Sequence, residues 1–317
     1  MKVDDLVKSA TSELGVRFNL VTLFPNLVFA GTLLFLLYAG APQKAPNLLV
    51  LGEIKEMGIM DGVFFIFAVV VFSLIVHPFQ ILLVRMLEGY WGQKGPGGAL
   101  ARWAVQRRQE AREKMDRKLA KILAKIQTGP DEAQKAALQK RAVDLSLQLQ
   151  QLYPGAERVL PTRLGNILRA AEDRAGAPYG LDAVTVWPRL YPLIPDGFRE
   201  RLDNQRLQLD LSVRYSVTFL GTAVGCLILL YAHGWWLLLP LGFLLLAYIT
   251  YRGALAAALL YGQGIRVAFD LYRFDLLQAL HLPLPATLAA EYAANRILCD
   301  FLRQGAPANF HYLHKAK

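Results

Sequence analysis

YSVTFLGTAVGCLILLYAHGWWLLLPLGFLLLAYITY, residues 215–251, is a run of 37 residues without a single Lys, Arg, Asp or Glu. Residues 18–43 and residues 62–84 are also free of these charged side chains. A helix needs about 20 apolar residues to cross a hydrocarbon core of about 30 Å, so each shorter run predicts one membrane-spanning helix. The longest run would measure about 55 Å as a single helix, which is too long for one crossing.

Ala232-His233-Gly234 interrupts the longest run near its middle. This break predicts two helices joined by a tight turn, which brings the number of predicted spans to four. The fourth helix continues past Arg252 to Tyr261, because the long arginine side chain can reach the headgroup layer. Helices are expected because lipid offers no hydrogen-bond partners to exposed backbone, and the runs lack the alternation of barrel strands.

The sequence therefore predicts an all-α integral membrane protein with four transmembrane helices. A large helical cytoplasmic insert separates spans 2 and 3, and a helical cytoplasmic tail follows span 4. The predicted segments are an N-terminal amphipathic segment (1–17), a first span hairpin (18–91), a cytoplasmic helical domain (92–213), a second span hairpin (214–262) and C-terminal cytoplasmic helices (263–317).

The distribution of Lys and Arg predicts the orientation. Residues 85–214 carry 23 of these side chains and the turn at 232–236 carries none. Cytoplasmic segments of membrane proteins are enriched in Lys and Arg. We therefore expect both termini and the large insert to be cytoplasmic, in a bacterial-type inner (plasma) membrane. Trp235 and Trp236 suit the opposite interface.

The net charge of +10 follows mostly from this bias and predicts attraction to anionic lipid headgroups. No nucleic-acid partner is expected, because no helix-turn-helix, zinc-finger or RNP-like motif accompanies the charge. The two cysteines, Cys226 and Cys299, fall in a span and in the tail, so neither a disulfide nor a metal site is predicted. No cofactor is expected.

The insert begins with two predicted helices, residues 99–127 and 132–152, which form a helical hairpin. Apolar residues of the second helix follow a 4-3-4-3 spacing typical of a coiled-coil seam, namely Leu138, Ala142, Leu145, Leu149 and Leu152. The hairpin can bury this seam on itself, or the seam can also contact neighbouring subunits.

The end of the insert is rich in proline and aromatic residues. Thr162 is predicted to cap a helix over 163–174, Asp182 a short helix over 183–187, and Asp196 a helix that runs into span 3. Closely spaced prolines hold a defined shape between the last two helices. This stretch either docks its aromatics on the helices or headgroups, or acts as a coupling elbow that passes cytoplasmic movement to span 3. The candidate elbow residues are Trp187, Pro188, Arg189, Tyr191, Pro192 and Pro195. A last helix is predicted in the tail, over 287–303.

Polar side chains are concentrated in spans 1 and 2. Thr22, Asn26, Ser73 and His77 are candidate pore-lining residues, although they can equally satisfy backbone groups freed by the nearby Pro25 and Pro78. Gly221 and Gly225 form a Gly-x-x-x-Gly pattern and are candidate helix-packing residues.

No motif of a known catalytic site is present, so the chain is not expected to be an enzyme. The order of spans and cytoplasmic segments resembles that of flagellar stator and biopolymer-transport proton-channel subunits. Leu220-Gly221-Thr222-Ala223-Val224-Gly225 is similar to a Leu-Gly-Thr-x-x-Gly stretch in one span of that family. This resemblance covers six residues and the topology, and implies a proton-channel subunit. The layout alone also resembles bestrophin-type anion channels.

The function expected from the sequence is an oligomeric channel or gated conduit controlled from its cytoplasmic domain, formed by a homo-oligomer. Two alternatives are a non-conducting membrane scaffold that recruits a cytosolic protein partner, and a stator-like proton-channel subunit.

Overall fold

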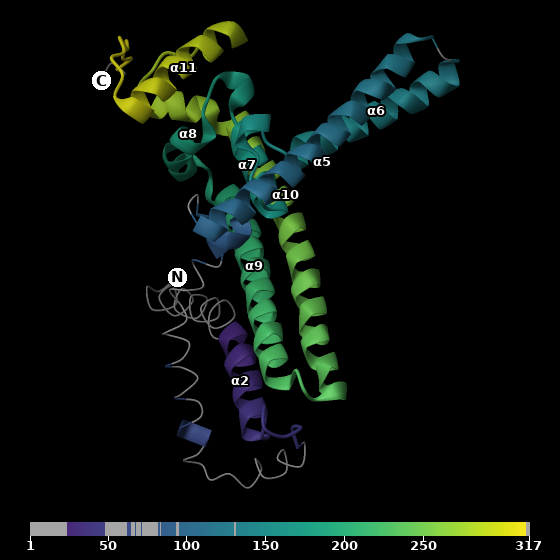
Figure 1. Cartoon of the computed structure of the whole chain (residues 1–317). Coiled ribbons are helices and arrows are strands. Elements are labelled where there is room, and N and C mark those ends of the chain that lie inside the picture. Colours follow the sequence, from purple (N-terminus) through teal and green to yellow (C-terminus); the bar gives the residue numbers. More distant parts are fainter. Residues whose placement is uncertain are drawn as a thin grey trace. The chain divides into compact units, whose positions relative to one another are not determined.

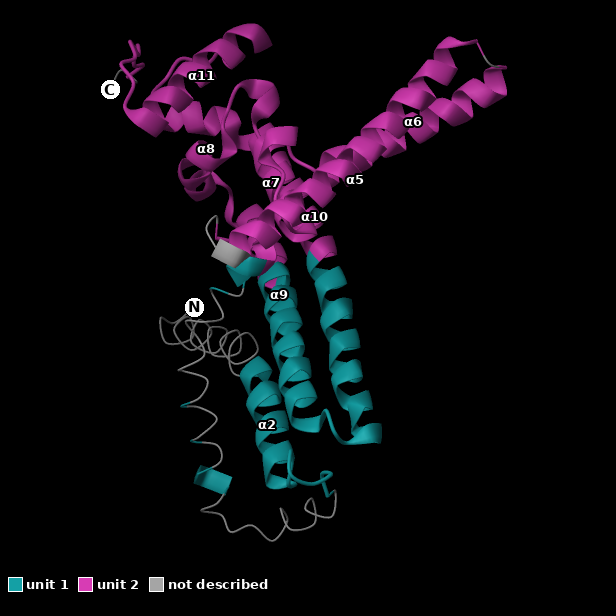
Figure 2. Cartoon of the chain, viewed as in Figure 1, with its two compact units in different colours: residues 1–86, 208–254 teal, residues 87–207, 255–317 magenta. Residues whose placement is uncertain are grey.

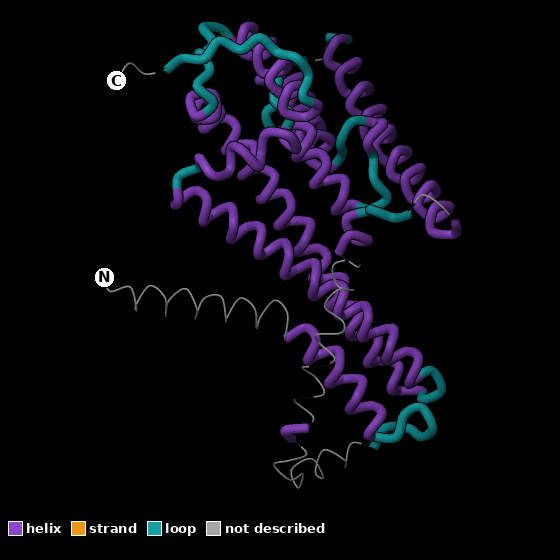
Figure 3. The backbone as a smooth tube through the Cα atoms, turned by 90° about the vertical axis from the view of Figure 1, so that its left-hand side faces the viewer, coloured by secondary structure: helices purple, strands orange, loops and turns teal. Residues whose placement is uncertain are grey.

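A computed structural model of the chain describes residues 24–47, 62–64, 67, 71, 82, 84–92, 95–129 and 131–314. Within these residues the chain forms helices and no strands, so the predicted all-helical class is confirmed (Figure 3). The predicted amphipathic segment 1–17 lies outside the described residues.

The chain divides into two compact units (Figure 2). Unit 1 comprises Met1–Met86 and Gln208–Ala254, and unit 2 comprises Leu87–Leu207 and Leu255–Lys317. The whole predicted tail and most of the predicted cytoplasmic insert therefore fall in one unit, although they are separate in the sequence.

Two of the described helices are long and apolar enough to cross a membrane. They are α9 (Asp196–Leu230) and the continuous segment of η5 (Gly234–Leu237) and α10 (Leu238–Ala279), and the turn between them lies where it was predicted (Figure 1). The shorter α2 (Phe24–Tyr38) is apolar as well. Most of the second predicted span, 62–84, lies outside the described residues, so the four-span topology stays a prediction.

In unit 1, α2 packs alongside α9. The rings of Phe24 and Tyr215 are 6.2 Å apart, and a Cβ atom added at Gly225 would lie 2.7 Å from Cδ2 of Leu33. Beyond the end of α2, the carbonyl oxygen of Pro42 lies 2.8 Å from Nε2 of His233. The partners of Phe24, Leu33 and Pro42 thus lie 191, 192 and 191 positions further along the chain. This constant offset means that α2 and α9 run parallel.

Unit 2 contains the helices of the predicted insert and tail. They are α5 (Gly95–Gln127), α6 (Glu132–Leu152), η2 (Ala156–Arg158), α7 (Arg163–Arg174), η3 (Ala177–Tyr179), α8 (Ala183–Leu190), η4 (Tyr191–Leu193) and α11 (Leu288–Gln304). The predicted hairpin of α5 and α6 is confirmed. The bounds of α6 and α7 agree with the predicted bounds at every terminal residue. Whether the seam of α6 also meets neighbouring subunits stays a prediction.

Side-chain caps explain where several helices begin. Oγ1 of Thr162 accepts a hydrogen bond from the backbone N–H of Gly165 at 3.0 Å, and Asp182 accepts one from that of Val184 at 3.2 Å. The predicted cap Asp196 is wrong, because Asp196 is already helical and its carboxylate pairs with Arg199. Pro195 precedes it, and its carbonyl accepts hydrogen bonds from the N–H groups of Phe198 and Arg199. Proline suits this position because no backbone N–H is needed there.

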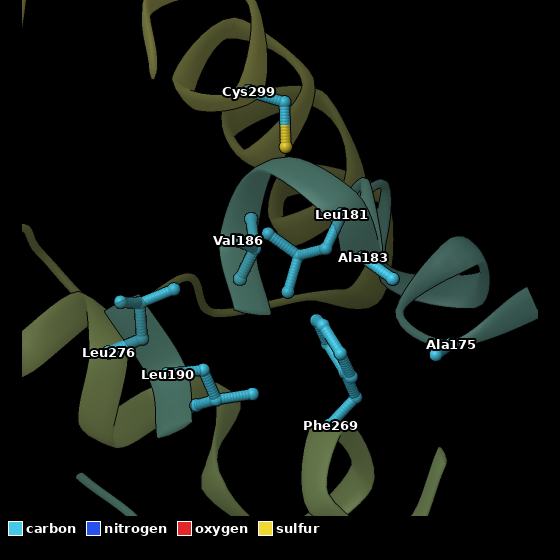
Figure 4. Packing of buried hydrophobic residues seen from close by; sticks show 8 residues of the cluster. All are labelled: Ala175, Leu181, Ala183, Val186, Leu190, Phe269, Leu276 and Cys299. Carbon is cyan, nitrogen blue, oxygen red and sulfur yellow. The ribbon is translucent and has the colours of Figure 1, made fainter. Parts of the chain in front are cut away.

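The main hydrophobic core of unit 2 joins the end of α7, α8, α10 and α11 (Figure 4). Its buried members are Ala175, Leu181, Ala183, Val186, Leu190, Phe269, Leu276 and Cys299. Figure 4 shows Phe269 rising from α10 toward Leu181, and the Cys299 side chain pointing from α11 toward the same cluster. This core supports the segment predicted to be an elbow.

Candidate functional site

The elbow, residues 187–195, is more helical than its prolines indicated. The predicted helix ended at residue 187, whereas α8 continues to Leu190 with Pro188 inside it, and η4 follows. Pro188 cannot donate to the carbonyl of Val184 one turn earlier, but Val184 is exposed and water can bind that carbonyl. The elbow is therefore a short helix followed by a 3₁₀ turn.

The indole ring of Trp187 connects the elbow to α10. It stacks on Phe269, with ring centroids 6.1 Å apart and planes inclined by 26°, and its centroid is 5.6 Å from that of Tyr191. Phe269 belongs to α10 and is fully buried. Aromatic pairs at such distances add to the free energy gained by burial, so a movement of Trp187 would disturb α10.

Tyr191 connects the elbow to α9. Its hydroxyl donates a hydrogen bond to the carboxylate of Asp203, and burial together with this bond raises the pKa of Tyr191 to about 12. Beside it, Ile194 is buried against Leu202 of α9 and Ala268 of α10. The same turn of the elbow thus contacts both long helices.

The other four candidate elbow residues do not take part in the packing of Trp187 and Tyr191. Pro188, Arg189, Pro192 and Pro195 are exposed, and Arg189 donates a hydrogen bond to the carbonyl of Thr185 at 2.7 Å. Of the two roles predicted for this segment, the structure shows the first: its aromatic residues pack against the helices.

Asp182 anchors the other end of α8. Its carboxylate accepts hydrogen bonds from the N–H of Val184, from Oγ1 of Thr185 at 2.8 Å and from Arg303 of α11. Burial acts to raise the pKa of Asp182, but the hydrogen bonds from Thr185 and Arg303 outweigh it, so the pKa lies below its ordinary value. The carboxylate therefore stays ionised and holds α8 to α11.

Next to η3, α10 and α11 are joined by a partly buried ion pair. Nε of Arg273 lies 2.7 Å from Oε1 of Glu291, whose side chain is almost completely buried. The guanidinium carbon of Arg273 also lies 4.0 Å from the ring centre of Tyr179, and the Tyr179 hydroxyl donates to Asp270 at 2.9 Å. Tyr179 of η3 and Trp187 of the elbow are thus both attached to α10.

The predicted pore-lining set is mostly outside the described part of the chain. Thr22, Ser73 and His77 lie outside the described residues, and Asn26 is buried in α2. The two candidate helix-packing glycines both face α2: a Cβ atom at Gly221 would lie 3.5 Å from Phe29, and one at Gly225 would touch Leu33.

Sequence reasoning missed the partners of the elbow. Phe269 lies 82 positions beyond Trp187, and no motif marks it or Asp203. In the described part of the chain, no group of three or more His, Cys, Asp or Glu side chains could hold a metal ion. No protein-family model, curated protein or solved structure matches this chain. Function is therefore inferred from the residues themselves.

Proposed function

We propose that this chain is a multi-pass membrane protein that assembles as a homo-oligomer and forms a conduit gated by unit 2 from the cytoplasmic side. One observation carries the proposal: the elbow contacts α9 through Tyr191 and Asp203 and α10 through Trp187 and Phe269. These are the two helices that also contain most of the uncharged residues 215–251.

The composition of the two helices supports such coupling. Neither helix has a proline beyond its first turn, and proline is the commonest cause of a sharp helix kink. A rotation or shift of α9 or α10 imposed by the elbow would therefore be carried along the helix rather than absorbed at a kink.

The parallel packing of α2 and α9 supports the proposed topology. If both helices cross the membrane in the same direction, the chain has to cross back between residues 47 and 215. The stretch 62–84 is the run in this interval that is long and uncharged enough for a return. Four spans with both termini on the cytoplasmic side satisfy this requirement, and the 23 Lys and Arg of residues 85–214 favour that side.

Ion flux into liposomes that contain the purified full-length chain tests the proposal. We expect flux above that of protein-free liposomes, and a several-fold change in Tyr191→Phe, which removes only the hydroxyl bound to Asp203. Tyr312→Phe is the matched control because Tyr312 is exposed, and it should leave the flux unchanged. Absence of flux at every membrane potential and pH would reject the conduit. Flux carried by protons alone would favour the stator-like alternative.

The scaffold alternative is favoured by one feature of the α5–α6 hairpin. The hairpin leaves Leu123, Val143 and Leu147 about half exposed, a feature of surfaces that contact other proteins. A stoichiometric cytosolic protein co-purifying with the full-length chain, together with absent flux, would support the scaffold in place of the conduit.

A further inference from the structure

Unit 2 contains a cavity directly beside the elbow. Its volume is about 360 Å³, and its wall includes Glu88, Arg169, Glu172, Trp187, Arg206 and Tyr261. These residues come from α7, the elbow, α9, α10 and the segment before α5. The volume lies within the range of small-molecule sites. Because a cavity of about 150 Å³ accommodates benzene, this one accommodates roughly a dozen non-hydrogen atoms.

The charges of the wall are balanced, with two arginines and two glutamates. Arg169 and Glu172 are one turn apart on α7, and Nε of Arg169 lies 3.8 Å from Oε2 of Glu172, too far for a hydrogen bond. Nε of Arg169 is buried and has no hydrogen-bond acceptor among the described residues. That nitrogen is covered, but the Arg169 and Glu172 side chains are 22% and 38% exposed, so parts of both are open to a ligand.

This arrangement discriminates between classes of ligand. A ligand with only negative charge would be repelled by Glu88 and Glu172. A ligand with only positive charge would be repelled by Arg169 and Arg206. A neutral ligand would offer no counter-charge to either kind of side chain, and hydrogen bonds to charged groups are stronger when the partner is also charged. A ligand that carries both charges a few bonds apart satisfies both kinds of side chain.

We propose that this cavity binds a small zwitterionic ligand, with its anionic group on Arg169 and its ammonium group on Glu172. Burial raises the pKa of Glu172, and a bound ammonium group would offset that effect by stabilising the carboxylate. Trp187 and Pro188 of the elbow and Arg206 of α9 line the same cavity. Occupancy therefore biases the position of the elbow, a consequence that rests on the proposed gating function.

Direct binding to the full-length chain, purified in a phospholipid-free detergent, tests the site by calorimetry. The probe is glycerophosphoethanolamine, a soluble zwitterion. Ethanolamine carries only its ammonium charge, and dimethyl phosphate carries only the single negative charge of its phosphodiester. We expect the zwitterion to bind at least tenfold more tightly than either analogue. Equal affinity of the three compounds, or no binding of the zwitterion, would overturn the proposal.

Three variants locate the site. Arg169→Gln and Glu172→Gln each remove one charge, and Val184→Trp fills the cavity from an exposed position, so it leaves the buried core intact. Each should weaken binding at least tenfold, whereas the exposed controls Arg189→Gln and Glu200→Gln should stay within twofold. Unchanged affinity in Val184→Trp would place the bound probe elsewhere and reject the site.

Nanodiscs distinguish the two sources of such a zwitterion. If the headgroup of phosphatidylethanolamine fills the cavity, nanodiscs of that lipid should abolish binding of the probe and nanodiscs of phosphatidylglycerol should not. If the ligand is a free solute, both nanodiscs should bind the probe alike. Calorimetry does not depend on flux, so the two proposals can fail separately. Absence of binding would reject this site and leave the conduit proposal unaffected. Absence of flux together with normal binding would reject the conduit and leave this site unaffected.

Discussion

Leu33 of α2 lies against Gly225 of α9 so closely that a Cβ atom added to the glycine would be 2.7 Å from Cδ2 of the leucine. The absence of a side chain at Gly225 allows the two helices to approach closely and gain van der Waals contact. The contact joins helices whose residues are almost 200 positions apart in the chain.

Gly225→Val should weaken this packing, because the added side chain must displace Leu33. Overpacking of this kind costs about 1–3 kcal/mol. Thermal unfolding of the detergent-solubilised chain, followed by tryptophan fluorescence, measures the effect. Gly242→Val is the matched control, since no atom would lie within 4 Å of a Cβ there. Equal midpoints for the two variants would contradict the observed packing.

Gly165→Ala should destabilise unit 2. A Cβ atom at this position would lie 1.8 Å from the carbonyl oxygen of Glu88, and backbone cannot move aside as a flexible side chain can. We expect a loss of about 3 kcal/mol, measured by denaturant unfolding. Gly197→Ala, on the first turn of α9 with open space around it, should be neutral or slightly stabilising. A similar response of both variants would show that Glu88 does not pack on α7.

Asn166→Ala should be more costly than most surface substitutions. The fully buried Asn166 accepts a hydrogen bond from the N–H of Leu160 at 2.7 Å and donates to the carbonyls of Leu160 and Thr162 at 2.8 and 2.7 Å. The substitution removes the side-chain partner of the Leu160 N–H and carbonyl, at a cost of about 2–4 kcal/mol, whereas the Thr162 carbonyl still accepts from the backbone N–H of residue 166. Asn204→Ala, at an exposed position of α9, should have little effect on the unfolding midpoint.

Asp182→Asn should reduce stability in a pH-dependent manner. The pKa of Asp182 is lower in the folded chain than in the unfolded chain, where it is about 3.9. Its stabilisation is therefore present above about pH 4 and is lost as the pH falls through the lower, folded pKa. The difference in unfolding midpoint between wild type and Asp182→Asn should be largest at neutral pH and shrink toward pH 3. A difference that is constant with pH would show that the carboxylate charge is unimportant.

Glu291→Ala should release α11, because it leaves the guanidinium of Arg273 without its ionic partner in a largely buried position. Removal of one member of a buried pair costs about 3–5 kcal/mol. Limited proteolysis should cut the residues after 285 faster in this variant than in wild type, and the exposed control Glu200→Ala should be cut at the wild-type rate.

Local features of the sequence predicted a large part of the secondary structure correctly. The bounds of α6 and α7, the caps Thr162 and Asp182 and the turn near His233 all follow from side chains within a few residues of one another. The prolines of the elbow misled the prediction, because Pro188 was expected to end a helix that continues to Leu190. Tertiary packing of Trp187 and Leu190 outweighs the single lost backbone hydrogen bond.

The sequence by itself determined where the uncharged, apolar runs lie and that the chain is helical, because hydropathy and helix capping depend on neighbouring residues. Only the tertiary structure decided that α2 runs parallel to α9, that the tail and most of the insert form one unit, and that Arg169, Glu172 and Trp187 line one cavity. Such contacts join residues far apart in the chain. They depend on the complementary shapes of whole helices, which no short stretch of sequence contains.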